Sequence, residues 1–411
     1  MRVGGPPALA RAAVSGVRGG DADGPRRGPS PRGRRRHPQP PARDRQPAHP
    51  RGLEARRDGE RPALPLRSGE GRARRRQDRR VSAPRLGIGL SPFASEPVAD
   101  FVAIAREAEA RGYHTAWVGE SSGYDAISVM TLIASHTERL HVGSAVVPVQ
   151  TRTPVVLGVS AASLGHLAPG RVVLGLGLSS RTIVSDWHGL PFENSLRQIR
   201  EAVQIVRLAA SGERVNFDGT FYRVKNFRMT ASPPETPVRI VLAALGPEML
   251  ELAGEIADGV VLNWIPPETV PASIKRLAGG ARRAGRTLDG FEIASFVRTC
   301  VTDDPATARE ALAREITGYA IVDAYASFFR SAGFGDEVDG VNAAWKAGDR
   351  AGAVKRISAR VLDGLGVVGE EAFCRARIVE FVRAGLTQPV IVPFAPPEAR
   401  AGLRRTLRAF P

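Results

Sequence analysis

Four short segments of this chain combine small residues with groups that could bind a ligand or move a proton. Glu120 follows the apolar run 115–118, and Ser144 lies in a stretch of small and apolar residues. Residues 175–180 read Gly-Leu-Gly-Leu-Ser-Ser, and residues 245–247 read Leu-Gly-Pro. A carboxylate can hydrogen-bond a cofactor ring or relay a proton. Glycine-rich turns and helix N-termini let backbone N–H groups approach an anion. Together these residue types favour a pocket that binds a cofactor.

All four segments follow predicted strands, and this is why they could share one pocket. The runs 115–118, 140–147, 172–176 and 238–243 are short and apolar, which is typical of parallel strands buried on both faces. Helical patterns separate them. The ends of parallel strands collect on one face of a sheet. We therefore expect Glu120 and the segments after the other strands to converge.

Each segment also has a purely structural interpretation. Glu120 could be an exposed loop carboxylate, and Asp125 could cap the next helix. Gly143 and Ser144 inside a strand indicate either a bulge near a ligand or close packing against a helix. The glycines at 175–177 could simply turn the chain, and residues 246–247 could be an ordinary junction with a helix.

The elements that would position these residues alternate along the chain. Eight strands are predicted, separated by helices, together with a hairpin over 215–224 that turns at Asp218 and Gly219. Residues 305–362 carry several helical patterns in succession. The alternation predicts an α/β fold, a (β/α)8 TIM barrel with a helical insertion before strand 8. A doubly wound open sheet is the alternative, although no GxGxxG follows the first strand. The predicted strands cover residues 86–90, 115–118, 140–147, 172–176, 238–243, 259–263, 291–301 and 389–393.

The first 80 residues differ sharply from the rest. They contain 22 Arg, no Lys and 8 acidic residues, so they supply +14 of the net charge of +16. They contain no Phe, Trp or Tyr, and we expect a disordered extension before a barrel domain at 81–411. An arginine tail could bind nucleic acid, but no aromatic residues interleave with the charges, so a solvated tail is the better interpretation of the two. We favour a third interpretation, that translation starts at Val81 and the extension is not natural protein.

Several classes of protein and site are disfavoured. No apolar run is long enough to span a membrane, and no signal-peptide core is present. Cys300 and Cys374 form no CxxC, which indicates a cytoplasmic protein with two buried thiols. The histidines lack metal-ligand spacing, and no GxSxG is found, so neither a metal site nor a hydrolase is expected.

The chain resembles the luciferase-like monooxygenase superfamily. Within that superfamily it is most similar to the oxidoreductases that use coenzyme F420, in the branch of the methylenetetrahydromethanopterin reductases. The resemblance covers about residues 86–410. The segments that carry it are residues 116–121, 139–145, 152–154, 170–177, 245–250 and 255–263.

This resemblance implies a deazaflavin at the carboxyl end of the barrel, with a bulge in strand 3 behind its ring. The implied bulge has a non-prolyl cis peptide between Ala145 and Val146. Many relatives carry Asp-His or Glu-His after strand 2, where this chain has Glu120-Ser121. Glu120 is the implied catalytic residue. The implied cofactor-binding residues are Ser144, Ala145, Val146, Gly175, Gly177, Leu178, Ser179, Ser180, Leu245, Gly246 and Pro247.

The function implied is hydride transfer between C5 of the deazaflavin F420 and a small organic substrate, with a methylenetetrahydromethanopterin-reductase-like reaction as one form. The alternatives are an FMN-dependent monooxygenase of the same fold and a non-catalytic flavin-binding protein. The family also implies a homo-oligomer, a dimer or larger. No membrane partner is expected.

Overall fold

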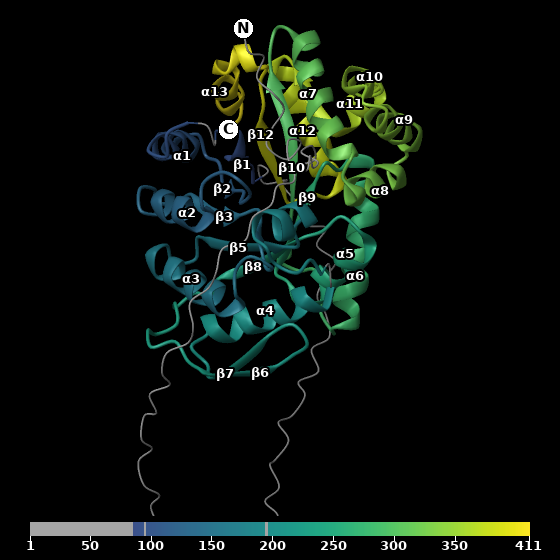
Figure 1. The fold of residues 1–411 in the computed structure, drawn as a ribbon. Coiled ribbons are helices and arrows are strands. Elements are labelled where there is room, and N and C mark those ends of the chain that lie inside the picture. The colour runs from purple at the N-terminus through teal and green to yellow at the C-terminus, as the bar shows by residue number, and fades with distance from the viewer. Residues whose placement is uncertain (1–84, 94–95, 194–195) are drawn as a thin grey trace, which may run out of the picture. The chain divides into compact units, whose positions relative to one another are not determined.

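The computed structural model describes residues 85–411 except 94–95 and 194–195 (Figure 1). The predicted extension over residues 1–80 and the proposed start at Val81 lie outside the described residues.

Eight parallel strand positions form a closed barrel (Figure 1). Each strand pairs with the next along the chain, and the last strand pairs with the first, Gly87 opposite Val390. The predicted (β/α)8 barrel is therefore confirmed, and the open-sheet alternative is wrong. The strands are β1 (Gly87–Gly89), β2 (Thr115–Val118), β3 (His141–Ser144) continued by β4 (Val147–Pro148), β5 (Val172–Gly177), β8 (Arg239–Ala243), β9 (Gly259–Asn263), β10 (Glu292–Val301) and β12 (Gln388–Pro393).

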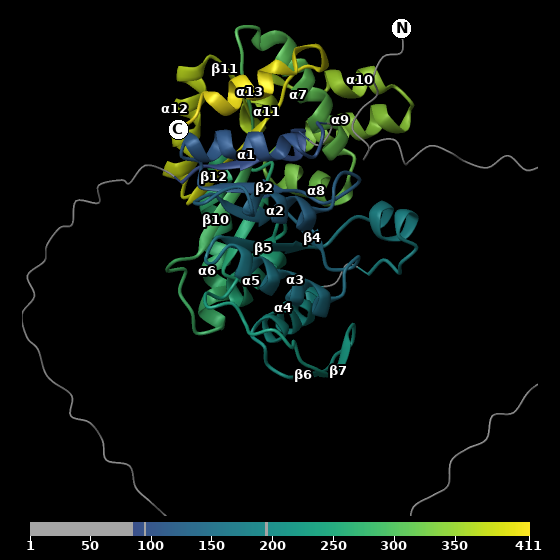
Figure 2. The same ribbon diagram turned by 90° about the vertical axis from the view of Figure 1, so that its left-hand side faces the viewer.

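Helices surround the barrel (Figure 2). The clearest of them bury one apolar stripe. In α4 the buried residues include Ile199, Ala202, Val203 and Val206, spaced i, i+3, i+4 and i+7 as on one face of a helix. The surrounding helices are α1 (Asp100–Ala110), α2 (Ala126–Ala134), α3 (Pro154–Leu167), α4 (Leu196–Ala210), α5 (Pro247–Ile256), α6 (Val270–Arg283), α12 (Glu371–Ala384) and α13 (Ala401–Arg408).

The predicted helical insertion is confirmed and has an apolar core of its own. That core includes Trp264 and Phe394, which directly follow β9 and β12, so the insertion packs against the carboxyl ends of these strands. A short strand, β11 (Gly366–Gly369), ends the insertion and pairs with β10. It was not predicted, because four small and apolar residues carry no clear period. The insertion consists of α7 (Pro305–Ala320), α8 (Asp323–Ser331), α9 (Gly335–Lys346), α10 (Arg350–Lys355) and α11 (Ala359–Leu365).

The predicted hairpin is present, but its turn is longer than expected. β6 (Val215–Asp218) and β7 (Arg223–Phe227) are joined by four residues, not by a two-residue Asp218-Gly219 turn. The carboxylate of Glu201, on α4, accepts the backbone N–H groups of Thr220 (2.9 Å) and Phe221 (2.8 Å). A buried acceptor from another element therefore fixes the turn, and local sequence carries no sign of it.

A layer of large side chains closes the middle of the barrel. Trp117, Val173, Val241 and Val390 belong to one interior cluster and are almost fully buried. The indole N–H of Trp117 donates to Oε1 of Gln388 at 2.7 Å, so its polar atom is satisfied. This layer forms a floor beneath the carboxyl end of the barrel.

Cys300 and Cys374 are both buried and free, as predicted. Burial raises the pKa of the Cys300 thiol to about 11, so it stays protonated at neutral pH. No helix in the described part of the chain is long and apolar enough to cross a membrane.

At the amino end of the barrel two histidine rings stack on each other. The centroids of His114 and His141 are 4.2 Å apart. Burial, together with the nearby charges of Arg85 and Arg239, lowers the pKa of each ring to about 4. Both rings are therefore neutral at physiological pH.

This pair predicts acid sensitivity of the fold. The unfolded chain, with histidine pKa values near 6.5, binds more protons than the native chain between pH 6.5 and about 4. We expect the free energy of unfolding to fall as the pH drops through this window. The substitution H141F removes one of the two groups and should flatten the pH dependence, measured by urea unfolding. H136F, at an exposed histidine, is the control. An unchanged slope in H141F would contradict the prediction.

Candidate functional site

The carboxyl ends of β2, β3–β4 and β5 lie side by side, as predicted. The backbone N–H of Ala145 donates to the carbonyl of Val118 at 2.7 Å, and that of Val149 donates to Gly177 at 3.1 Å. The structure thus brings together segments that follow three different strands.

The third strand position contains the predicted bulge. β3 stops at Ser144 and β4 begins at Val147, and the peptide bond between Ala145 and Val146 is cis. The buried hydroxyl of Ser144 accepts the N–H of Gly175 at 2.8 Å and donates to its carbonyl at 2.9 Å. This side chain replaces the backbone ladder at the bulge, so Ser144 supports the site from behind.

Two glycines of β5 let the bulge approach closely. A Cβ on Gly175 would lie 1.9 Å from the carbonyl oxygen of Ser144, and one on Gly177 would lie 2.6 Å from a methyl of Val146. Ala145, Val146 and Ala243 are half-buried, whereas the layer beneath them is almost fully buried. The barrel mouth therefore presents a partly exposed apolar surface of small side chains. Such a surface fits the face of a planar, largely apolar ring system.

Glu120 lies at the edge of this surface and is held by three donors. Arg152 donates from Nε to Oε1 (3.0 Å) and from Nη2 to Oε2 (2.8 Å), and the N–H of Ala126 donates to Oε2 (3.1 Å). Its side chain is 14% exposed. The sequence did not predict this role of Arg152, because its partners Glu120 and Asp125 are remote along the chain. Hydrogen bonding to Glu120 is the main reason that the pKa of Arg152 is raised.

Asp125 caps α2, as predicted, and is the second partner of Arg152. Its Oδ1 accepts the N–H of Ser128 at 2.7 Å, and its Oδ2 accepts from Arg152. Burial alone would raise the pKa of Asp125, but the bonds from Ser128 and the charge of Arg152 lower it overall. One guanidinium thus fixes two carboxylates.

A cavity of about 280 Å³ opens beside this ion-paired group. Its wall also contains part of the loop after β5, where a π-helix (Thr182–Trp187) forms in place of an irregular loop. His188, which follows the π-helix, also lines the cavity. The residues that line it include Glu120, Asp125, Pro148, Arg152, Ile183 and His188.

In the first predicted anion loop, residues 175–180, several polar groups are already hydrogen-bonded within the protein. Leu178 is half-buried against the core, the N–H of Ser179 donates to Oε1 of Gln150 at 3.2 Å, and Oγ of Ser180 accepts from Ile183 at 3.3 Å. The first turn after β5 therefore ties its own polar groups into the fold.

The second predicted anion loop is open. Gly246 is the N-cap of α5 and has no side chain that could accept from the first N–H groups of the helix. Pro247 occupies the first turn. Both residues are exposed, and Leu245 before them is half-buried. The N-terminus of α5 is therefore accessible to solvent.

A polar cluster that the sequence analysis missed lies where the insertion meets the barrel. Asn263 and Arg298, at the carboxyl ends of β9 and β10, contact Glu315, Tyr319 and Tyr325 of the insertion. An asparagine and an arginine at inward positions, in line with the apolar Val261 and Phe296, were the available signal.

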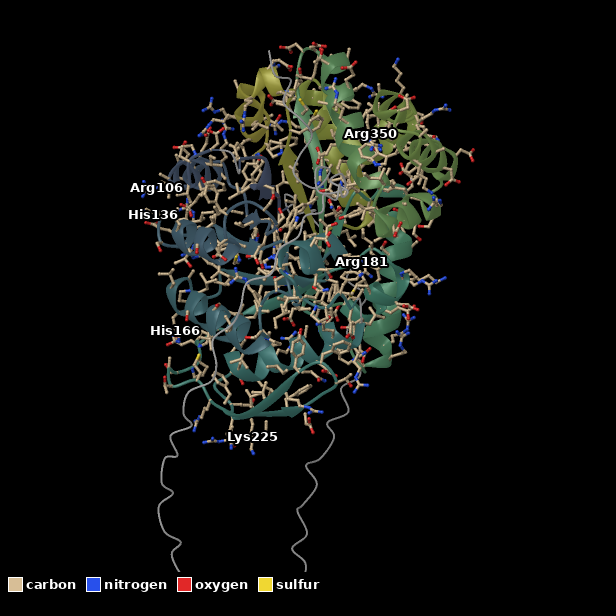
Figure 3. All side chains as sticks on the ribbon, in the orientation of Figure 1. Arg106, His136, His166, Arg181, Lys225 and Arg350 are labelled. Carbon is tan, nitrogen blue, oxygen red and sulfur yellow. The ribbon has the colours of Figure 1, made fainter. Side chains whose placement is uncertain are left out.

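Histidines on the outer helices are remote from the barrel mouth. Figure 3 shows His136 and His166 at the outer edge of the barrel, away from Arg181. Among the described residues no group of three or more His, Cys, Asp or Glu side chains could hold a metal ion.

Comparison with known proteins identifies the family. Residues 75–388 match the family described as luciferase-like monooxygenase. The chain belongs to this family. It is also 29% identical over 329 residues to the 5,10-methylenetetrahydromethanopterin reductase of Methanolobus tindarius, covering 76% of this chain and 96% of that protein. The chain is accordingly an oxidoreductase.

Solved structures show the same fold. The coenzyme F420-dependent tetrahydromethanopterin reductase of Methanopyrus kandleri superposes with a TM-score of 0.69 at 22% identity, over 80% of this chain and 99% of that one. The oxygenating constituent of 3,6-diketocamphane monooxygenase of Pseudomonas putida, in complex with FMN, has a TM-score of 0.58 at 16% identity, over 80% of this chain and 97% of that one.

The glycine contact at the bulge makes a stability prediction. In G175A the new methyl group meets the Ser144 carbonyl, so the bulge must shift. We expect a loss of about 2 kcal/mol or more in the free energy of unfolding, measured in urea. In the control, G246A, the methyl group has no neighbour within 4 Å, and we expect a change within about 0.5 kcal/mol. Equal effects would contradict the assignment.

Proposed function

We propose that this oxidoreductase uses coenzyme F420 and transfers a hydride between C5 of the deazaflavin and a small organic substrate. The observation that carries the proposal is the half-buried apolar surface that Ala145, Val146 and Ala243 form at the bulge. The similarity to the reductase of Methanolobus tindarius supports it. Its substrate, 5,10-methylenetetrahydromethanopterin, is the first to test.

The chain would contribute binding, orientation and exclusion of water. When bound, F420 supplies the hydride chemistry. Ala145 and Val146 would support one face of the ring, with Ser144, Gly175 and Gly177 holding the bulge in place. The segments 178–180 and 245–247 would lie near the phosphate group and the tail of the cofactor. Among these, the open N-terminus of α5 at Gly246 has the N–H groups best suited to an anion.

Glu120 would hydrogen-bond the ring or assist a proton transfer. Its Oε2 already accepts two bonds, from Arg152 and Ala126, and its Oε1 accepts one, from Arg152. A carboxylate oxygen has two lone pairs in its plane. One acceptor position on Oε1 is therefore left for a donor on a ligand, and the ion pair with Arg152 keeps the group oriented toward the cavity.

An FMN-dependent monooxygenase is the second candidate. It is favoured by the family match and by the shared fold with an FMN-bound monooxygenase. The apolar surface at the bulge would accept either tricyclic ring. The two candidates differ in their reaction with oxygen, since a reduced deazaflavin reacts poorly with it.

Titration with each cofactor tests the proposal. We expect purified protein to bind F420 with a dissociation constant in the micromolar range or below, followed by the change in its fluorescence. Reduced FMN, added without oxygen because the free compound reacts with oxygen by itself, should show no binding by ultrafiltration. Binding of reduced FMN, together with no binding of F420, would favour the monooxygenase instead.

Filling the apolar surface should block the cofactor. Ala243 is half-buried and lies against Gly177, so the longer side chain in A243L would occupy the place of the ring. We expect the affinity for F420 to fall about tenfold or more, since each 1.4 kcal/mol of lost contact is a factor of ten. A103L, an exposed position on α1, is the matched control and should bind as the unaltered protein does. Unchanged binding by A243L would place the ring elsewhere.

A further inference from the structure

In the polar cluster between the barrel and the insertion, the hydrogen bonds fix which groups act as donors and which as acceptors. Its two barrel residues are Asn263 and Arg298. Asn263 is the last residue of β9, and Arg298 lies near the end of β10. Val261 and Phe296, two residues before each of them, belong to the interior cluster. Because side chains alternate along a strand, Asn263 and Arg298 also face inward, above the floor of the barrel. They lie at the mouth that holds the proposed cofactor surface.

Arg298 is held from several sides. Its Nε donates to Glu315 at 3.0 Å, its Nη2 donates to the hydroxyl of Tyr319 at 3.3 Å, and its side chain is only 6% exposed. The guanidinium carbon lies 4.0 Å from the ring centroid of Trp264, a cation–π contact. Its charge is balanced by Glu315, so the guanidinium serves as a fixed set of donors.

This arginine determines how the Asn263 amide is oriented. Nη1 of Arg298 donates to Oδ1 of Asn263, and a guanidinium has no acceptor, so the amide oxygen must face it. Nδ2 then faces the hydroxyl of Tyr325 and donates to it at 2.8 Å. One amide N–H is left over. Because Tyr325 accepts in this bond, its own hydroxyl proton is also left over.

The cluster therefore has more donors than acceptors. Among the described residues, no acceptor is recorded for the second N–H of Asn263, for the hydroxyl proton of Tyr325 or for the buried indole N–H of Trp264. Burial raises the pKa of Tyr325, so its hydroxyl remains a donor. Asn263 and Tyr325 are half-buried and partly open to solvent. A ligand that completes the cluster must bring an acceptor.

We propose that Asn263 and Tyr325 form a two-donor site for the carbonyl oxygen of a neutral organic substrate, and that Arg298 is the residue that positions the amide. The donors are uncharged and the charge of Arg298 is already paired with Glu315, which favours a neutral ketone or aldehyde over an anion. The inference rests on the proposed function only for the idea that this ligand is the substrate beside the cofactor.

Two probes of the same shape test the proposal. Cyclohexanone has a carbonyl oxygen where methylenecyclohexane has a CH₂ group. We expect the full chain to bind the ketone about tenfold more tightly, measured by ligand-observed NMR with and without F420, since the ketone oxygen accepts two hydrogen bonds that the CH₂ group cannot accept. Equal affinities, or no binding of the ketone up to its solubility, would overturn the proposal.

Variants with conserved shape show which groups are responsible. In N263D the new carboxylate still accepts from Arg298 and also takes the Tyr325 hydroxyl proton, so both free donors vanish and the ketone preference should disappear. Y325F removes one donor and should leave a preference of about threefold. N216D, in the remote hairpin, is the matched control and should keep the full preference. A full preference retained in N263D would overturn the proposal.

The role of Arg298 has a separate readout. A lysine ammonium lacks the planar, fixed set of donors with which Arg298 bonds Glu315, Tyr319 and Asn263 at the same time, so R298K should let the amide turn and reduce the ketone preference, while the affinity for methylenecyclohexane stays the same. If both affinities fall equally, Arg298 is only structural. F420 affinity is measured in parallel. Loss of the ketone preference with normal F420 binding concerns this site alone, and a ketone preference without F420 binding would refute the proposed cofactor and leave this site standing.

Discussion

The barrel mouth depends on one contact, between the backbone of Ser144 and the bare Cα of Gly175. The Ser144 carbonyl takes the space that any side chain at residue 175 would need, and the Ser144 hydroxyl takes both hydrogen bonds that the interrupted ladder would leave open. A buried, unpaired backbone group costs more than a typical hydrogen bond gains. The bulge therefore exists because one hydroxyl and one glycine occur in register on neighbouring strands. Without it, Ala145 and Val146 would continue a flat strand and would not turn toward the mouth.

The fold was largely predictable, because its determinants are local. Apolar runs buried on both faces and amphipathic stripes such as that of α4 are read directly from spacing, and they gave eight strands in the correct places. Two features were missed for different reasons. Glu201 lengthens the hairpin turn from another element, and β11 is too short to show a period. Single-residue features of strand 3, by contrast, were visible, since Gly143 and Ser144 interrupt an apolar run.

The site was predictable in position but not in its hydrogen bonding. That Glu120 and the glycines of β5 should converge follows from parallel strands. That Glu120 is held by Arg152 does not, because 32 residues separate the two and a surface arginine has many available partners. This ion pair changes how Glu120 acts. A carboxylate with three of its four acceptor positions occupied can orient a ligand through the fourth. To take up a proton, it would have to weaken its bonds to Arg152.

The two sides of the barrel mouth differ in how many of their hydrogen-bond donors have acceptors within the protein. On the side of β2 to β5 most polar groups are matched: Glu120 with Arg152, Ser144 with Gly175, and the Ser179 amide with Oε1 of Gln150, although the buried Nε2 of Gln150 has no partner among the described residues. Such a surface offers a ligand mainly its shape. On the side of β9 and β10, donors exceed acceptors, and a buried arginine is held in place to orient a single amide. An apolar surface with few free polar groups suits a ring that binds through its flat face. Unmatched donors suit a group that binds through its acceptor atoms. This asymmetry is our reason for proposing that the cofactor lies on the first side and the substrate on the second. On that proposal the insertion, which supplies Tyr325 and Glu315, would determine the choice of substrate.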